Sequence, residues 1–207
     1  MIFRWLRHRG PIALVSTLDH IRHKRHARAA LKGAQNAKVA GKADIGGPFT
    51  LIDSATNKSF SSDQLKGTWS LLYFGFTHCP DICPTTLAEL AQLKAQLADT
   101  EADATRVVML SVDPARDTPE RLAQYVPYFY PDFVGVTGEF TEILSVAQRL
   151  NAPFRKVSEP DGSYQMEHSA NVILMNPRGD YHGFFRAPLD IPKMRVTLRS
   201  TQYLWEH

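Results

Sequence analysis

The two cysteines are the residues of this 207-residue chain best suited to chemistry, and they stand close together. Cys79 and Cys83 are the only cysteines, and three residues separate them. An apolar run precedes them and a helical pattern of leucines begins at Leu87, so both thiols fall between a buried strand and the first turn of a helix. Free amides and the positive end of the helix dipole favour a thiolate there. The pair therefore predicts thiol redox chemistry, metal binding, or both.

The spacing of the pair leaves its chemistry open. Thioredoxin-type oxidoreductases have two residues between their cysteines, whereas Cys79 and Cys83 have three. The wider loop lets both sulfurs point toward one further group, such as a bound metal ion, while they remain close enough to form a disulfide. A purely structural disulfide is a further alternative, but a bridge that closes so short a loop stabilises little.

A third ligand is needed if the pair holds a metal, and His168 is the best candidate. It stands immediately before an apolar strand pattern at 171–175, and a loop entering one strand can lie beside a loop leaving another. Two thiolates and one imidazole form a soft three-coordinate site, which suits Cu(I) and accepts Cu(II) with one added oxygen ligand. Zinc would require a fourth protein ligand, and the sequence offers none. Without the cysteines, His168 would be interpreted as an ordinary hydrogen-bonded loop histidine.

Three other features have simpler interpretations. His78 is adjacent to Cys79, but neighbouring residues on an extended segment point in opposite directions, so we do not expect it to be a ligand. His182 falls in a strand pattern and is predicted to be structural. The segment 113–117 follows a buried strand at its carboxyl end, where active-site loops of α/β folds gather. We interpret its charges as an internal ion pair and a helix cap.

The elements that must position these residues alternate between strands and helices. We expect strands at 49–53 and 58–60 forming a hairpin, then strands at 69–76, 106–112, 171–175 and 181–185, and helices at 85–98, from Thr118 onward, at 140–150 and at 191–204. This order predicts an α/β, thioredoxin-like fold with an N-terminal β-hairpin and a C-terminal hairpin plus helix.

The charge distribution divides the chain into an arm, 1–44, and one domain, 45–207. Residues 1–43 carry ten Lys/Arg and a single acid, whereas the rest holds 14 basic and 20 acidic residues. Arg-rich, acid-poor N-termini suit mitochondrial import, so we interpret the arm as disordered targeting or juxtamembrane sequence. Its apolar stretch 11–18 is short against the roughly 20 residues that span a bilayer, so we expect no transmembrane helix. Nothing in the domain supports nucleic-acid binding.

The run 73–84, YFGFTHCPDICP, resembles the signature of the Sco/SenC family of copper-binding cytochrome c oxidase assembly proteins. The segments 46–49, 111–120, 136–138 and 168–171 match the family in the same order. This resemblance implies a thioredoxin-like fold in which Cys79, Cys83 and His168 bind one copper. It also implies service to the binuclear copper centre of cytochrome c oxidase subunit II, as a metallochaperone supplied by an upstream copper donor protein, as a thiol reductant of that subunit's cysteines, or as both.

The chain departs from the family pattern in places. The family commonly has Asp before the ligand histidine, where this chain has Glu167, and a transmembrane anchor before the domain, where this chain shows none. A thiol-disulfide oxidoreductase of this fold would be expected to have a proline in the loop that faces its cysteines. This chain has Ala170 after the His168 loop instead. Both this residue and the three-residue spacing of the cysteines favour copper binding. The resemblance places the protein at the mitochondrial inner membrane, facing the intermembrane space, with the bacterial periplasm as the alternative.

Overall fold

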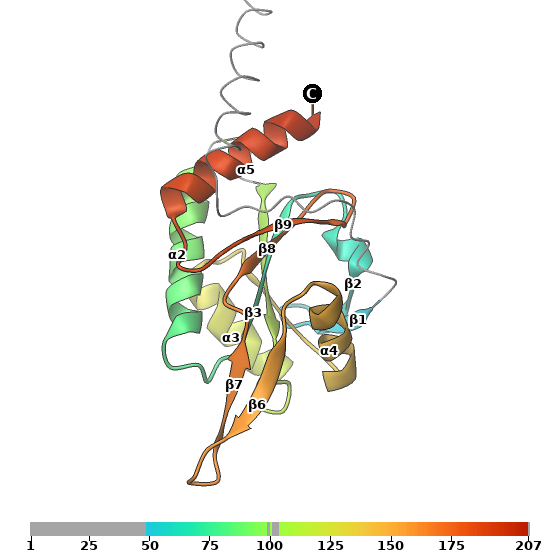
Figure 1. Cartoon of the computed structure of the whole chain (residues 1–207). Helices are drawn as coiled ribbons and strands as arrows, with labels where there is room; N and C mark the ends of the chain where they lie inside the picture. The colour runs from blue at the N-terminus through green and yellow to red at the C-terminus, as the bar shows by residue number, and fades with distance from the viewer. Residues whose placement is uncertain (1–48, 99, 101–103, 207) are drawn as a thin grey trace, which may run out of the picture.

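The computed structural model describes residues 49–98, 100 and 104–206, which form an α/β fold with a central sheet and surrounding helices (Figure 1). The basic arm predicted for residues 1–44 lies outside this range. No helix in the described part of the chain is long and apolar enough to cross a membrane.

The strands occur in two sheets. A seven-stranded sheet has the order β2-β1-β5-β4-β3-β8-β9, and β6 and β7 form a separate two-stranded sheet. The strands are β1 (Thr50–Asp53), β2 (Lys58–Ser61), β3 (Ser70–Gly75), β4 (Arg106–Ser111), β5 (Val134–Thr137), β6 (Phe154–Ser158), β7 (Tyr164–His168), β8 (Val172–Met175) and β9 (Tyr181–Phe185). The helices are the 3-10 helix η1 (Ser62–Leu65), α2 (Ile82–Leu97), α3 (Pro119–Phe129), α4 (Phe140–Arg149) and α5 (Ile191–Glu206).

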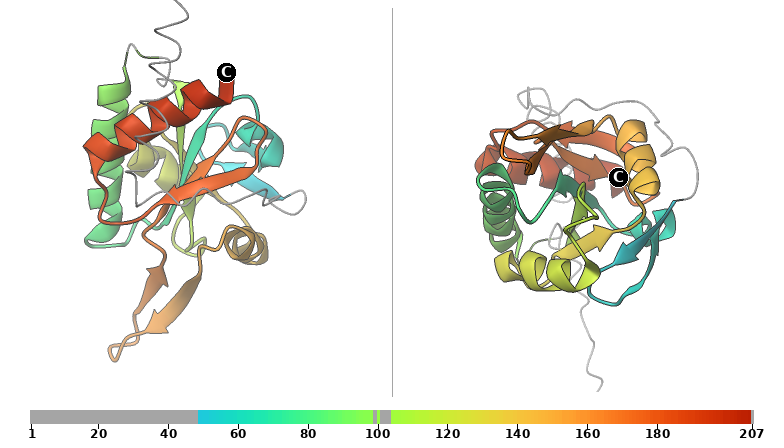
Figure 2. Two further views of the ribbon diagram at one scale, coloured as in Figure 1. Left: turned by 45° about the horizontal axis from the view of Figure 1, so that its top comes forward. Right: turned by 90° about the horizontal axis from the view of Figure 1, so that it is seen from below.

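The core is built around parallel strands β3, β4 and β5, which α2 and α3 connect. Every residue of β3 is buried, as expected for a strand covered on both faces. Right-handed crossovers in one direction along the sheet put α2 and α3 on the same face, and α4 lies against the other (Figures 1 and 2). α5 packs beside α2.

Strand direction brings distant segments to one end of the sheet, where β3 and β4 finish. The loop after β3 carries the cysteines, and the loop after β4 is its neighbour because the two strands are parallel. β8 runs antiparallel to β3, with Val172 opposite Tyr73, so the chain that enters β8 arrives at this same end of the sheet. The sequence-based expectation that His168 and the cysteines approach one another from adjacent strands is therefore sound in its topology.

Two details of the sequence interpretation are wrong. The helix expected to begin at residue 85 begins at Ile82, because Pro84 is tolerated in the first turn and the Thr85 N–H already bonds to the carbonyl of Asp81. His168 was expected in a loop, but it ends strand β7 of a hairpin with β6. Met166 is the only buried residue of these two strands, so they lack the buried apolar run by which the central strands were predicted.

The other expected elements are present. β1 and β2 form the N-terminal hairpin, and β8, β9 and α5 form the C-terminal hairpin and helix. Thr118 caps α3 by accepting a hydrogen bond from the backbone N–H of Arg121. The predicted α/β architecture is confirmed; strand β5 and the β6–β7 hairpin are additions to it.

Candidate metal centre

Three side chains from separate parts of the sequence converge beyond the end of β3. One ligand atom from each of Cys79, Cys83 and His168 lies within 4.8 Å of the other two. Cys83 Sγ and His168 Nε2 are 3.3 Å apart. These are the residues that the sequence analysis selected, and they form the one such group of three found among residues 49–98, 100 and 104–206.

The two cysteines are held differently and are unequally accessible. Cys79 lies in the turn after β3, where its N–H bonds to the carbonyl of Phe76 at 3.3 Å. Cys83 lies in the first turn of α2, and its N–H donates to Cys79 Sγ at 3.4 Å. Both thiols are free; Cys79 is 9% exposed, whereas Cys83 is 0% exposed. A partner molecule can therefore reach Cys79 first.

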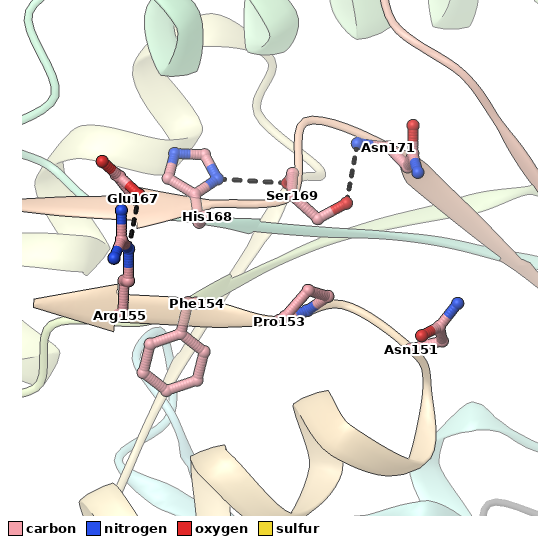
Figure 3. A pocket seen from close by; sticks show the side chains of 8 residues that line it. All are labelled: Asn151, Pro153, Phe154, Arg155, Glu167, His168, Ser169 and Asn171. Atoms are coloured by element: carbon pink, nitrogen blue, oxygen red, sulfur yellow. Dashed lines mark hydrogen bonds and ion pairs between the residues drawn. The ribbon is translucent and has the colours of Figure 1, made fainter.

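The imidazole of His168 is fixed in position and in tautomer. Its ring meets the rings of Tyr73 and Phe76 edge-on, with centroids 5.9 and 5.8 Å away. Its Nδ1 lies 3.1 Å from the carbonyl oxygen of Ser169, which can only accept, so Nδ1 carries the proton (Figure 3). The lone pair is therefore on Nε2, the nitrogen that faces Cys83.

The electrostatics of the pair are asymmetric. A hydrogen bond from the Cys83 thiol is the main cause that lowers the pKa of Cys79 well below its usual range, against the opposing effect of burial. Backbone amides of Asp81 and Cys83 at the helix start add to the lowering. The same hydrogen bond, followed by burial, raises the pKa of Cys83. In the reduced, metal-free protein the first thiolate is thus on Cys79.

A buried carboxylate anchors the loop that carries Cys79. Asp117, wholly inaccessible, accepts hydrogen bonds from the backbone N–H of Thr77 at 3.0 Å, the hydroxyl of Thr77 at 2.6 Å and the hydroxyl of Ser111 at 2.7 Å. Arg121 Nε donates to the same Thr77 hydroxyl at 2.6 Å. The loop after β3 is therefore tied to the loop after β4 two residues before the first sulfur.

The ion pair predicted within 113–117 is present, and its arginine also contacts β7 and the cysteine loop. Arg116 pairs with Asp113, and its guanidinium lies 3.8 Å from the ring centroid of Tyr164 and 5.7 Å from that of Phe76. Its Nη1 donates to the carbonyl of Tyr164 at 3.3 Å. Arg116 therefore joins the start of β7 to the cysteine loop, which fixes the strand that ends at His168. The sequence of the segment 113–117 alone does not reveal this link, because Tyr164 lies 48 residues after Arg116.

The remaining candidates lie outside the group of three. His78 is turned toward Thr77 and Asp117, at 3.3 and 3.8 Å, as expected from its orientation opposite to Cys79. His182 packs edge-on against Trp69, and burial lowers its pKa, which agrees with a structural role. Glu167, which precedes the histidine, is exposed and forms an ion pair with Arg155 (Figure 3).

The three donors fit copper better than zinc. Two sulfurs and one imidazole nitrogen are soft ligands whose number matches a three-coordinate Cu(I) site. A structural zinc site would need a fourth protein ligand, and the described residues add none to the group. A groove of about 470 Å³ opens beside the group, between Cys79–Ile82 and β7, so a ligand or partner has access.

The fold and the site define the class of protein: a thioredoxin-like α/β protein with a Cys-Cys-His group. The family model described as SCO1/SenC matches residues 37–202, so the chain belongs to the SCO1/SenC family. The match spans most of the chain and confirms the resemblance seen in the sequence motifs.

Named relatives and solved structures agree with this assignment. The mitochondrial protein SCO1 homolog 1 of Arabidopsis thaliana is 38% identical over 174 residues, which cover 83% of this chain and 52% of the relative, so the chain spans about half the length of that protein. A SCO2-like protein of Rickettsia conorii is 37% identical over 158 residues, covering 75% of this chain and 76% of that protein.

Two solved structures show the same fold. The crystal structure of Arabidopsis thaliana ScoI with copper bound superposes with a TM-score of 0.70 at 36% identity, covering 79% of this chain and 100% of that one. BsSco, described with a disulfide switch and as a member of the Sco family of cytochrome c oxidase assembly proteins, gives 0.63 at 27% identity, covering 82% and 98%.

Proposed function

We propose that this protein is a copper metallochaperone that carries one Cu(I) on Cys79, Cys83 and His168 to the binuclear copper centre of cytochrome c oxidase subunit II. The observation that carries the proposal is the convergence of three soft donor atoms within 4.8 Å of one another. A relative at 36% identity has been crystallised with copper bound, which supports the choice of metal. Cu(II) is accommodated by one added oxygen ligand.

Transfer of the copper proceeds by ligand exchange. A thiolate of the acceptor protein approaches through the groove, binds the copper and displaces Cys79, the more exposed of the two cysteines. Displacement of Cys83 and His168 follows as further acceptor ligands bind. The copper keeps its oxidation state and is never released as a free ion. Loading from an upstream copper donor protein follows the reverse order.

An anaerobic Cu(I) titration of the reduced protein against a competing chelator tests the proposal. We expect about one tightly held copper, and His168→Ala should bind at least tenfold more weakly because it removes one ligand of three. His78→Ala is the matched control: it removes a neighbouring imidazole outside the group and should leave the affinity unchanged. Wild-type affinity in His168→Ala would refute the three-ligand site.

A second activity, thiol-disulfide exchange on the cysteines of subunit II, is favoured by the free pair and by the lowered pKa of Cys79. The Cys79 thiolate attacks a disulfide of the acceptor, one acceptor sulfur leaves as a thiolate, and Cys83 then resolves the mixed disulfide. The acceptor gains two electrons and this protein ends as a Cys79–Cys83 disulfide. His168→Ala should leave this exchange intact, which separates it from copper transfer.

The cellular setting is part of the proposal. We assign the protein to the mitochondrial inner membrane, facing the intermembrane space, or to the bacterial periplasm, since both compartments allow a cysteine pair to cycle. Relatives named mitochondrial and relatives from Rickettsia support either setting. Residues 1–44 serve as the targeting or juxtamembrane arm and residues 45–207 as the copper-binding domain. Fractionation of cells that express the whole chain tests this assignment.

A further inference from the structure

The β6–β7 hairpin has a free edge beside the cysteines. β7 pairs with β6 alone in the part of the chain that the structure describes, so its other edge has no neighbouring strand. Figure 1 shows β6 on the side of α4 and β7 on the side of the loop that enters α2. That loop carries Cys79, so the unpaired edge faces the candidate metal centre.

The register shows which backbone groups lie on this free edge. The N–H of Ser169 donates to the carbonyl of Pro153, and the N–H of Glu159 donates to the carbonyl of Ser163. In an antiparallel ladder the hydrogen-bonded residues alternate, so Gln165 and Glu167 also bond to β6. The N–H and C=O groups of the residues between them, Tyr164, Met166 and His168, therefore point away from β6.

One of these groups is already used. The carbonyl of Tyr164 accepts a hydrogen bond from Arg116 Nη1, which closes one end of the edge. Among the residues that the structure describes, the N–H and C=O groups of Met166 and His168 have no hydrogen-bond partner, although the Met166 residue is only 6% exposed. Backbone groups that are withdrawn from most solvent contact and lack a partner favour pairing with another backbone.

A groove follows the same edge. It has a volume of about 470 Å³, and four consecutive residues of β7, from Gln165 to His168, form one wall, with no residue of β6. The opposite wall runs from Phe76 through Cys79 to Ile82, a residue that is 39% exposed. The groove is thus mostly apolar on its flanks and offers backbone hydrogen bonds along one side. An extended polypeptide matches both features.

We propose that the free edge of β7 binds an extended, cysteine-bearing segment of the partner protein as an added antiparallel strand, which places the partner's thiol opposite Cys79. Antiparallel pairing is chosen because it is the more stable arrangement per residue. The partner residue opposite Met166 directs its side chain to the same face as Met166 and His168, the face toward the cysteines. The inference deepens the proposed function by naming how the acceptor is held.

A tethered peptide tests the proposal without copper. The probe is the blocked peptide Thr-Val-Thr-Cys-Thr-Val-Thr, its cysteine activated as a disulfide with thionitrobenzoate. In the full chain carrying Cys83→Ser, the Cys79 thiolate attacks the peptide sulfur, a Cys79–peptide disulfide forms, and thionitrobenzoate leaves with the bonding electron pair. Its absorbance reports complete reaction. Amide hydrogen exchange of the adduct is then measured residue by residue.

We expect the amides of Met166 and His168 to exchange roughly tenfold more slowly in the adduct than in the free protein. Gln165 and Glu167, already bonded to β6, should not change. Two methylated peptides are matched controls. In the first, methyl groups on the backbone nitrogens of the cysteine and both valines face β7 and should abolish the protection. In the second, methyl groups on the backbone nitrogens of three of the four threonines face outward and should preserve it.

Three results would overturn the proposal: unchanged exchange at Met166 and His168 in the adduct, equal protection with both methylated peptides, or protection in the free protein through pairing with a second copy of the chain. Failure here is distinguishable from failure of the proposed function. The Cu(I) titration of the wild-type protein does not involve the edge of β7, and the peptide experiment contains no copper.

Discussion

Gly75, the last residue of β3, has no side chain, and the ring of Tyr73 and the sulfur of Cys83 lie close beside it. A Cβ added at this position would lie 2.8 Å from Tyr73 Cε1 and 3.2 Å from Cys83 Sγ. The first distance is shorter than real Cβ contacts, and both neighbours are fully buried, so neither can move into solvent. Gly75→Ala must therefore shift the tyrosine ring, the sulfur or both.

The expected cost follows from this overpacking. Extra methyl groups in a well-packed core destabilise by about 1–3 kcal/mol. For a protein of this length, about 2–4 °C of melting temperature is lost per kcal/mol, so Gly75→Ala should melt roughly 2–12 °C below wild type. Displacement of a ligand sulfur should also weaken Cu(I) binding about ten- to a hundredfold, by analogy with the loss of groups that orient metal ligands.

Gly135→Ala is the matched control for the copper effect. A Cβ at Gly135, in β5, would lie 2.8 Å from Ser54 Oγ and 3.1 Å from Leu122 Cβ, an equally crowded position that touches none of the three candidate ligands. Both variants are measured by thermal unfolding of the reduced, metal-free protein and by Cu(I) competition. Equal destabilisation with Cu(I) affinity lost only in Gly75→Ala is the expected result. Wild-type affinity in Gly75→Ala would refute the link between this glycine and the sulfur.

Three further predictions concern charge and protonation. Because the pKa of Cys79 is lowered and that of Cys83 is raised, iodoacetamide at pH 6 should label Cys79 first in the metal-free protein; equal labelling in peptide mass spectra would contradict this. Asp117→Asn replaces a carboxylate that accepts three hydrogen bonds. It should lower the free energy of unfolding, measured in urea, by about 1–3 kcal/mol. Burial lowers the pKa of His182, so the unfolded state binds its proton more readily and stability should fall as the pH decreases below about 6.5. His182→Phe should flatten that decrease, and an unchanged pH profile would exclude His182 as its source.

The candidate ligands could be predicted because their chemistry is local in sequence. Cys79 and Cys83 are the only cysteines, and their place between a buried strand and a helix follows from apolar patterns alone. His168 could be selected because a strand begins just after it, and the antiparallel pairing of β8 with β3 satisfies that expectation. Position along the sheet was enough to predict that the three candidate ligands lie close together, as they do in the structure.

The parts that escaped prediction depend on contacts between residues far apart in the chain. Asp117 was expected to contribute to an ion pair or cap, yet it anchors Thr77, 40 residues earlier, and no local pattern reports such a bond. Only Met166 of the β6–β7 hairpin is buried, and β6 lacks the apolar alternation that identifies a half-buried strand. Its position is fixed instead by Arg116, which is bound to the carbonyl of Tyr164 and stacked on its ring.

These hidden contacts explain why the site can be both fixed and open. Asp117 holds the cysteine loop from the side of β4, and Arg116 holds β7 from the same loop, so two neighbouring residues after one strand position both walls of the groove. Neither side chain occupies the space between those walls. The donor atoms are therefore positioned before any metal or partner arrives, which reduces the ordering cost of binding, while the groove beside β7 stays open. A loop in place of the hairpin would carry the same histidine but would offer no ladder of backbone groups beside Cys79.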